Sequence, residues 1–314
     1  MSKRKTSNLA ASVRQRLLNL SRERQEAFNL VLAQYAIERF LFRLSQSPFA
    51  AQFVLKGATL FAVWSGKLHR PTRDVDLLGY GDNSNERLRE LFSKLCELPV
   101  EPDGLIFDAD SIRIEEIREL QEYGGKRIIL SVRLDTAVIP LQIDIGFGDV
   151  VTPGAAWLTY PTLLPFPEPH VRTYPKESVV AEKFQAMVFL GISNSWMKDF
   201  YDLWVLSRQF PFHGLTLAQA IQATFIQRQT VITSAIPIAL TIEFGENPNK
   251  TKQWQAFLNR NQLDLDVSLV QVLTGLQDFL LPPWQAIAEE QVFKATWAPR
   301  GPWTSFEEWT TLKS

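Results

Sequence analysis

The chain has 314 residues, 46 % of them hydrophobic, so it can bury a substantial core and we expect two subdomains. Its 33 basic and 34 acidic side chains leave a formal net charge of −1, which argues against a uniform positive coat for nucleic acid and leaves room for a local basic surface. A single cysteine, Cys96, excludes a disulfide framework, and no apolar run is long enough to span a bilayer. We therefore expect a cytoplasmic protein that does not enter a membrane.

The first half of the chain alternates helical and strand-like patterns. Residues 11–47 predict two helices with a break near Leu20 and Ser21. The elements expected next are a short strand at 53–55, a turn at Lys56-Gly57-Ala58-Thr59, a short helix at 58–65, strands at 74–78, 111–116, 126–135 and 137–145, and a helix at 86–96. Together they predict an α+β fold with a small mixed β-sheet and flanking helices.

The second half of the chain predicts a mainly helical domain. Proline is frequent from Pro153 to Pro175, which indicates an extended connection and the clearest domain boundary. We expect one domain over residues 1–160 and a helical one over 161–314, with helices at 178–190, 196–208, 216–227, 251–260 and 266–279. Pro282-Pro283 and the segment 297–303 predict irregular structure. Several late tryptophans suit core packing or a docking surface, and core packing is favoured.

Two carboxylates, Asp74 and Asp76, flank Val75 in the strand expected at 74–78. Alternate strand residues share a face, so both carboxylates point the same way while Val75 points into the core. Like charges at about 4 Å repel by about 4 kcal/mol at an effective dielectric of 20, and a divalent cation with oxygen ligands reverses that repulsion. The alternative is a solvated strand edge.

A third carboxylate, Asp144, occurs in the strand expected at 137–145. The alternating apolar residues Ile143 and Ile145 predict the buried face, so Asp144 stands on the opposite face, where it could join Asp74 and Asp76. The alternative is an ordinary solvent-facing aspartate.

Two later helices carry charged residues near their apolar stripes. Lys183 lies at the margin of the stripe of helix 178–190, where it either keeps its ammonium group in water or contacts a triphosphate. Lys198 and Asp199 open the next helix, and Asp199 shares a face with Asp202 and Leu203. Acids in a first helical turn are favoured by the helix dipole, and here they also suit a group that orients a catalytic lysine.

In this order and combination, these residues resemble the AbiEii/AbiGii toxin family of nucleotidyltransferases, within the polymerase-β-like superfamily. The resemblance runs from about residue 12 to residue 206. The turn from Lys56 to Thr59 followed by Asp74-Val75-Asp76 is similar to the first motif, and Asp144 matches the second motif's carboxylate. Lys183 matches the third motif's lysine, and Lys198-Asp199 with Asp202-Leu203 matches the fourth.

The resemblance implies a nucleotidyltransferase core in the first domain and a Mg²⁺-dependent (or Mn²⁺-dependent) transfer of a nucleotide from an NTP. It implies catalytic roles for Asp74, Asp76, Asp144, Lys183 and Asp199, with Asp74, Asp76 and Asp144 as the metal ligands. The nucleotide would be bound by Lys56, Gly57, Ala58, Thr59 and Lys198. The family also implies a toxin that modifies the 3′ end of tRNA, beside a cognate winged-helix antitoxin.

The basic residues Lys67, Arg70 and Arg73 precede the acid pair, and we expect them to contact RNA or nucleotide phosphates. Two positions depart from the family pattern: Ala58 replaces the usual serine after the glycine, and Trp196 stands where a basic residue is expected. Three alternatives stay open. The first is nucleotidyl or phosphoryl transfer to a protein or small molecule. The second, which the two departures favour, is an inactive scaffold that acts as a binding module, and the third is an α+β protein whose acids are only surface residues.

Overall fold

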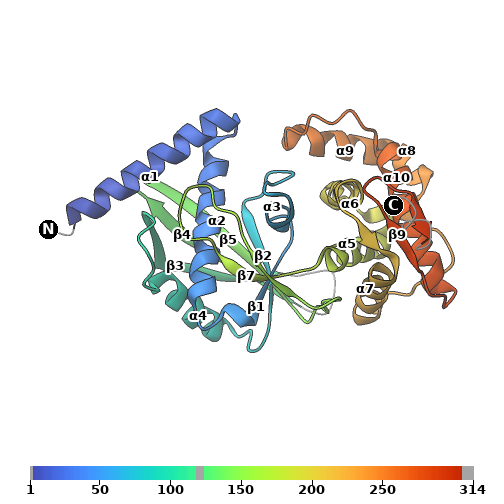
Figure 1. Cartoon of the computed structure of the whole chain (residues 1–314), viewed down its shortest axis with the longest axis horizontal. Coiled ribbons are helices and arrows are strands. Elements are labelled where there is room, and N and C mark those ends of the chain that lie inside the picture. Colours follow the sequence, from blue (N-terminus) through green and yellow to red (C-terminus); the bar gives the residue numbers. More distant parts are fainter. Residues whose placement is uncertain (1–2, 118–123, 306–314) are drawn as a thin grey trace, which may run out of the picture. The chain divides into compact units, whose positions relative to one another are not determined.

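The computed structural model of the protein describes residues 3–117 and 124–305. The chain divides into two compact units (Figure 1). Unit 1 comprises the residues up to Asp149 together with Ala155–Tyr174, and unit 2 comprises Val150–Gly154 together with the residues from Pro175 onward. The boundary that the sequence suggests, between residues 160 and 161, lies inside unit 1.

Unit 1 is built on a seven-stranded mixed sheet with the order β3-β4-β5-β2-β1-β7-β6. The pairs β2–β5 and β1–β7 are parallel, and the other neighbouring strands are antiparallel. The strands are β1 (Phe53–Lys56), β2 (Asp74–Gly79), β3 (Leu105–Ile117), β4 (Gly125–Leu134), β5 (Ala137–Phe147), β6 (Ala156–Thr159) and β7 (His170–Thr173). The predicted α+β fold class is confirmed.

The helices of unit 1 pack around this sheet, and α2 and α4 contact β5 and β3, respectively. They are α1 (Lys3–Arg24), α2 (Phe28–Gln46), the 3₁₀ turn η1 (Ala50–Gln52), α3 (Leu60–Ser65) and α4 (Asn85–Glu97). Alternation along the central strands builds the core as predicted, since Val75, Ile143 and Ile145 are each 0 % exposed. The residues between them, on the opposite face, are the candidate site residues.

The break predicted near Leu20 and Ser21 is wrong, because α1 continues to Arg24. Ser21 does not cap a new helix. Its carbonyl accepts from the N–H of Glu26 at 3.0 Å and its hydroxyl donates to the Glu26 carbonyl at 3.1 Å. Gln25 takes a left-handed φ of 55°, so these bonds form the usual terminating motif of a helix one turn later than the sequence suggests.

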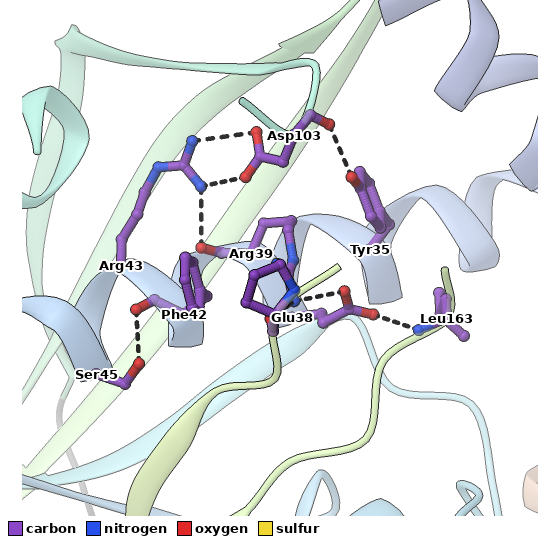
Figure 2. A network of polar contacts seen from close by, with 9 residues as sticks. Tyr35, Glu38, Arg39, Phe42, Arg43, Ser45, Asp103 and Leu163 are labelled. Carbon is purple, nitrogen blue, oxygen red and sulfur yellow. Dashed lines mark hydrogen bonds and ion pairs between the residues drawn. The ribbon is translucent and has the colours of Figure 1, made fainter. Parts of the chain in front are cut away.

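A buried polar network on α2 ties loops to the helix (Figure 2). The Arg43 guanidinium donates to both Asp103 oxygens, at 2.6 and 3.2 Å, and the Tyr35 hydroxyl donates to the Asp103 carbonyl at 2.7 Å. Arg43 and Asp103 are 6 % and 2 % exposed. Because each charge is paired inside the fold, the loop before β3 is fixed against α2.

The second half of this network joins α2 to the loop between β6 and β7. The Leu163 N–H donates to Glu38 Oε2 at 2.6 Å, and Arg39 Nη2 lies 2.8 Å from Glu38 Oε1 and donates to the Pro167 carbonyl at 2.8 Å. Figure 2 shows the Leu163 backbone turned toward the Glu38 carboxylate. Burial raises the pKa of Glu38 to about 7, since desolvation outweighs the opposing effect of Arg39.

Unit 2 is mainly helical and also carries a three-stranded sheet with the order β10-β9-β8. Its helices are α5 (Lys176–Leu190), α6 (Met197–Gln209), α7 (Gly214–Gln227), α8 (Ile242–Glu246), α9 (Pro248–Arg260) and α10 (Leu269–Ala288), with 3₁₀ turns η2 (Gly191–Ser193) and η3 (Ile238–Leu240). Its strands are β8 (Phe212–His213), β9 (Ala295–Trp297) and β10 (Trp303–Ser305). Across the described ranges of both units, no helix combines the length and the apolar character needed to cross a membrane.

Irregular structure at Pro282-Pro283 is a wrong prediction, whereas residues 298–302 are irregular as expected, between Trp297 at the end of β9 and Trp303 at the start of β10. Both prolines lie inside α10, where the following Trp284 is 2 % exposed and donates to the Ala235 carbonyl at 3.2 Å. Trp297 is 3 % exposed in β9 and donates to the Ser207 carbonyl at 2.6 Å. Aromatic packing outweighs the local cost of proline here, and the core-packing interpretation of these tryptophans is confirmed.

The raised pKa of Glu38 predicts a pH-dependent stability. The folded chain keeps a proton on Glu38 that the unfolded chain releases, so the stability it contributes is full below pH 4.5 and is lost as the pH rises through about 7. The loss is on the order of 3 kcal/mol. We expect Glu38→Gln to flatten the fall in the free energy of unfolding between about pH 5 and about pH 8, measured by urea unfolding. Parallel pH profiles of wild type and variant would contradict this.

Candidate active site

The turn after β1 brings the backbone against a carboxylate. Gly57 has a φ of +76°, and a Cβ at this position would lie 1.9 Å from Asp76 Oδ2. Glycine is therefore required both by the left-handed conformation and by the close approach of Asp76. Ala58 and Thr59 are 3 % and 1 % exposed, and the Thr59 hydroxyl donates to the Lys56 carbonyl at 3.2 Å. The Thr59 hydroxyl is therefore engaged inside the turn.

Three carboxylates meet on the face of the sheet opposite the core. Parallel pairing of β2 with β5 places Asp76 directly beside Asp144 and Asp74 beside Gln142. One oxygen from each of Asp74, Asp76 and Asp144 lies within 4.8 Å of the others, and all three side chains are half-buried. Within residues 3–117 and 124–305 this is the only such group of three potential metal ligands. Three converging carboxylates with oxygen-only donors fit Mg²⁺ or Mn²⁺.

Neighbouring side chains already orient these carboxylates. The Thr72 hydroxyl donates to Asp74 Oδ1 at 2.5 Å. Arg127 on β4 donates from Nε and Nη2 to the two oxygens of Asp144, each at 2.8 Å, and Gln142 Nε2 lies 3.2 Å from both of these oxygens. Sequence reasoning missed all three positioning residues.

The register of the sheet arranges the charges in one row. Lys56 on β1 stands beside Asp76, Asp76 beside Asp144, Asp144 beside Arg127, and Arg127 beside Glu115 on β3. The hydrogen bond to Asp144 raises the pKa of Arg127 above its ordinary value, and the charges of Asp144 and Asp74 add to the effect. Two adjacent acids are thus flanked by a cation on each side, which offsets their mutual repulsion.

Lys56 connects the row to the loop after β5. Its Nζ lies 2.7 Å from Asp149 Oδ2 and 5.4 Å from the centre of the Tyr174 ring. Asp149 comes after the last strand residue, Phe147, so it lies in a loop as the sequence suggests. A phosphate that binds Lys56 therefore competes with a half-buried ion pair.

The predicted RNA contacts Lys67, Arg70 and Arg73 all lie in the loop between α3 and β2, which leads directly to Asp74. Lys67 and Arg73 are exposed and Arg70 is half-buried. Thr72, between them, is 7 % exposed and anchors this loop through its bond to Asp74.

In unit 2 the predicted lysine is held between two acids. Lys183 Nζ on α5 lies 2.6 Å from Asp199 Oδ1 and 2.9 Å from Asp202 Oδ2, both on α6. Asp199 is 5 % exposed and Asp202 is fully buried, whereas Lys198 is exposed. The acids therefore fix the Lys183 ammonium group, and Lys198 points to solvent.

The departure at Trp196 lies at the start of α6, where Trp196 is the N-cap residue and is 43 % exposed. Its N–H donates to the Asn194 side-chain oxygen at 2.8 Å, so Asn194 stabilises the turn that precedes the helix. The indole of Trp196 therefore lies on the surface of unit 2.

Unit 1 thus carries a cluster of carboxylates on one face of a mixed sheet, and a mainly helical unit follows it. The family model described as nucleotidyl transferase AbiEii toxin, type IV TA system, matches residues 39–290, and the chain belongs to this family. No functionally curated protein matches the sequence.

Three solved structures are similar at low identity. JHP933 from Helicobacter pylori is 15 % identical with a TM-score of 0.45, over 80 % of this chain and 89 % of that one. A candidate nucleotidyltransferase from H. pylori is 16 % identical with a TM-score of 0.41, over 80 % and 92 %. An antigenic nucleotidyltransferase-like protein from Paracoccidioides brasiliensis is 14 % identical with a TM-score of 0.33, over 75 % and 91 %.

Gly57→Ala tests the close approach of the turn to Asp76. The new Cβ displaces the Asp76 carboxylate, so we expect Mn²⁺ affinity to fall at least about tenfold and stability to fall by about 1–3 kcal/mol. Gly66→Ala is the matched control, because Gly66 has a φ of +75° and a Cβ added there would meet only open space. It shares the conformational cost and should keep the Mn²⁺ affinity in a spin-resonance titration. Equal affinities in the two variants would contradict the account.

Lys183→Met tests the ion cluster of unit 2. Removing the ammonium group leaves two buried carboxylates without their cation, so we expect a loss of about 3–5 kcal/mol in the free energy of unfolding. Lys198→Met, at an exposed position of α6, should change the free energy of unfolding by no more than about 0.5 kcal/mol. Urea unfolding followed by tryptophan fluorescence compares the two, and similar losses would refute the assigned difference.

Proposed function

We propose that the protein is a Mg²⁺- or Mn²⁺-dependent nucleotidyltransferase toxin that transfers a nucleotide from an NTP to the 3′ end of tRNA and thereby blocks translation. The observation that carries the proposal is the convergence of Asp74, Asp76 and Asp144 within 4.8 Å, in a chain of the AbiEii family. A cytoplasmic site of action and a cognate winged-helix antitoxin belong to the same proposal.

In the proposed reaction, the acceptor hydroxyl oxygen forms a bond to the α-phosphorus of the NTP as the bond to the β-phosphate bridging oxygen breaks. The products are the extended RNA, pyrophosphate and the proton released from the hydroxyl. Bound divalent ions supply Lewis acidity to the attacking and leaving oxygens. Asp74 and Asp76 would hold one or two such ions, and Asp144 would complete the ligand set for the second.

The remaining residues bind and orient. Gly57 lets the turn approach phosphate closely, and Lys56 and the backbone at Ala58 and Thr59 bind the triphosphate. The family resemblance assigns Lys183 to the pyrophosphate side, and Asp199, at 2.6 Å, fixes its ammonium group. Lys198 adds a solvent-facing cation for phosphate.

The acceptor is recognised through charge in this proposal. Lys67, Arg70 and Arg73 lie on the loop that ends at Asp74, so a polyanion held there lies next to the carboxylates. Binding through such phosphate contacts weakens as the salt concentration rises. Each contact contributes a slope of close to −1 to a plot of log affinity against log salt concentration.

Transfer to tRNA can be measured directly with the four labelled NTPs, Mg²⁺ and total tRNA. We expect label in tRNA with the wild type and a loss of at least about a thousandfold with Asp76→Asn, which keeps the side-chain shape and removes the charge. Asp135→Asn is the matched control, because Asp135 is exposed in a turn with a φ of 53°, which asparagine also adopts.

The same assay separates the alternatives. If label enters a protein or a small molecule from a lysate and none enters tRNA, the acceptor is not tRNA, and the protein is still a nucleotidyltransferase. Nucleotide binding without turnover under any metal would favour a binding module. Equal label with wild type and Asp76→Asn would contradict the metal role of Asp76.

A further inference from the structure

Both oxygens of the Asp144 carboxylate are held by neighbouring side chains. The Arg127 guanidinium binds both carboxylate oxygens with two parallel bonds of 2.8 Å, and Gln142 Nε2 lies 3.2 Å from each oxygen. A bidentate guanidinium–carboxylate pair is among the strongest and most directional hydrogen-bonded arrangements in proteins. Any cation that uses Asp144 must share it with Arg127.

The sheet fixes this pairing. Arg127 and Asp144 are direct partners in the antiparallel register of β4 and β5, and Asp144 and Asp76 are direct partners in the parallel register of β5 and β2. The guanidinium therefore stands on the β4 side of the carboxylates, between Asp144 and Glu115 in the row. It carries one positive charge where a divalent ion would add two more.

Arg127 can leave Asp144 without disturbing the core. Its side chain is 36 % exposed, whereas that of Asp144 is 18 % exposed. The guanidinium fork that matches a carboxylate also matches a phosphate, so a triphosphate offers it an equivalent partner. The negative charge of the triphosphate attracts both the Arg127 guanidinium and a bound divalent ion. When Arg127 leaves Asp144 for the triphosphate, the repulsion between its guanidinium and that ion is therefore relieved.

We propose that Arg127 is a phosphate-binding residue that exchanges Asp144 for the triphosphate of the incoming NTP, and so couples nucleotide binding to completion of the metal site at Asp144. The inference rests on the proposed function and adds a residue and an order of events to it. Without nucleotide, Arg127 occupies Asp144 and opposes the metal ion. With nucleotide, Asp144 is released, and by linkage the metal in turn tightens nucleotide binding.

Metal binding without nucleotide is the first test. Mn²⁺ is titrated into the wild type, Arg127→Gln, Arg127→Lys and Arg133→Gln, and free Mn²⁺ is read by spin resonance. We expect Arg127→Gln to bind Mn²⁺ at least about tenfold more tightly than the wild type, and Arg127→Lys to fall between them. Arg133→Gln is the matched control: Arg133 also lies on β4 and pairs with Asp108 at 2.8 Å, outside the carboxylate group. It should behave as wild type.

Nucleotide binding at saturating Mn²⁺ is the second test, with each of the four α,β-methylene nucleoside triphosphates in equilibrium dialysis. We expect the affinity of the preferred analogue to fall at least about tenfold in Arg127→Gln, with partial recovery in Arg127→Lys and no change in Arg133→Gln. If Arg127 had only a structural role, its replacement would weaken the binding of both metal and nucleotide. The opposite signs for metal and nucleotide are therefore the signature of exchange.

Asp76→Asn separates the two levels of the account. If it leaves the Mn²⁺ affinity of the chain unchanged, the proposed function itself fails. If it abolishes Mn²⁺ binding while Arg127→Gln matches the wild type for both ligands, only the exchange is overturned. Weaker Mn²⁺ binding in Arg127→Gln and Arg127→Lys would also overturn it, since Arg127 would then serve only to orient Asp144.

Discussion

The parallel pairing of β2 with β5 is the constraint on which the candidate site depends, because it decides that Asp76 and Asp144 are lateral neighbours on one face. A slip of one residue would send every side chain of a strand to the other face. The opposite, apolar face prevents this slip. Val75 pairs with Ile143 and Leu77 with Ile145, and all four are between 0 % and 1 % exposed.

The magnitudes explain why the core can hold like charges together. Full burial of each aliphatic side chain contributes about 1.5–3 kcal/mol. Two carboxylates about 5 Å apart repel by about 3 kcal/mol at an effective dielectric of 20. Four buried side chains on two strands outweigh that repulsion, and Arg127 and Thr72 reduce it further through their bonds to Asp144 and Asp74. The site is therefore assembled by packing on the far side of the same strands.

The two units stabilise their charged groups in different ways. In unit 1 the carboxylates are half-buried on the face of the sheet opposite the core. In unit 2 the Lys183 ammonium group is enclosed by Asp199 and Asp202 with a side-chain exposure of 14 %. One arrangement keeps acids available for a cation, and the other keeps a cation in a fixed orientation. Both suit a protein of the nucleotidyltransferase class, whose substrate carries several negative charges.

Much of this site follows from sequence periodicity. Alternation along residues 74–78 and 139–145 is enough to place Asp74, Asp76 and Asp144 opposite a core face, since strand geometry is local. Adjacency of the two strands is not local, because parallel partners are joined by long connections. Arg127 is within reach of the sequence: with a two-residue turn at Asp135 and Thr136, counting outward along β4 and β5 pairs Arg127 with Asp144.

Other features could not be predicted from local pattern. The helical course through Pro282-Pro283 and the small sheet around Trp297 depend on aromatic packing with segments far away in the chain, such as the Trp297 bond to the Ser207 carbonyl. The sequence indicates that Gly57 suits a phosphate loop. In the structure, the atoms that exclude a side chain at position 57 belong to the Asp76 carboxylate. This contact depends on the pairing of β1 with β2, which the local sequence does not reveal.

The central claim is that Asp74, Asp76 and Asp144 form one metal site, and anomalous diffraction from crystals grown with Mn²⁺ and a non-hydrolysable NTP tests it most directly. We expect anomalous density within about 2.3 Å of oxygens from all three carboxylates. Density at other residues, or none beside these carboxylates at saturating Mn²⁺, would contradict it.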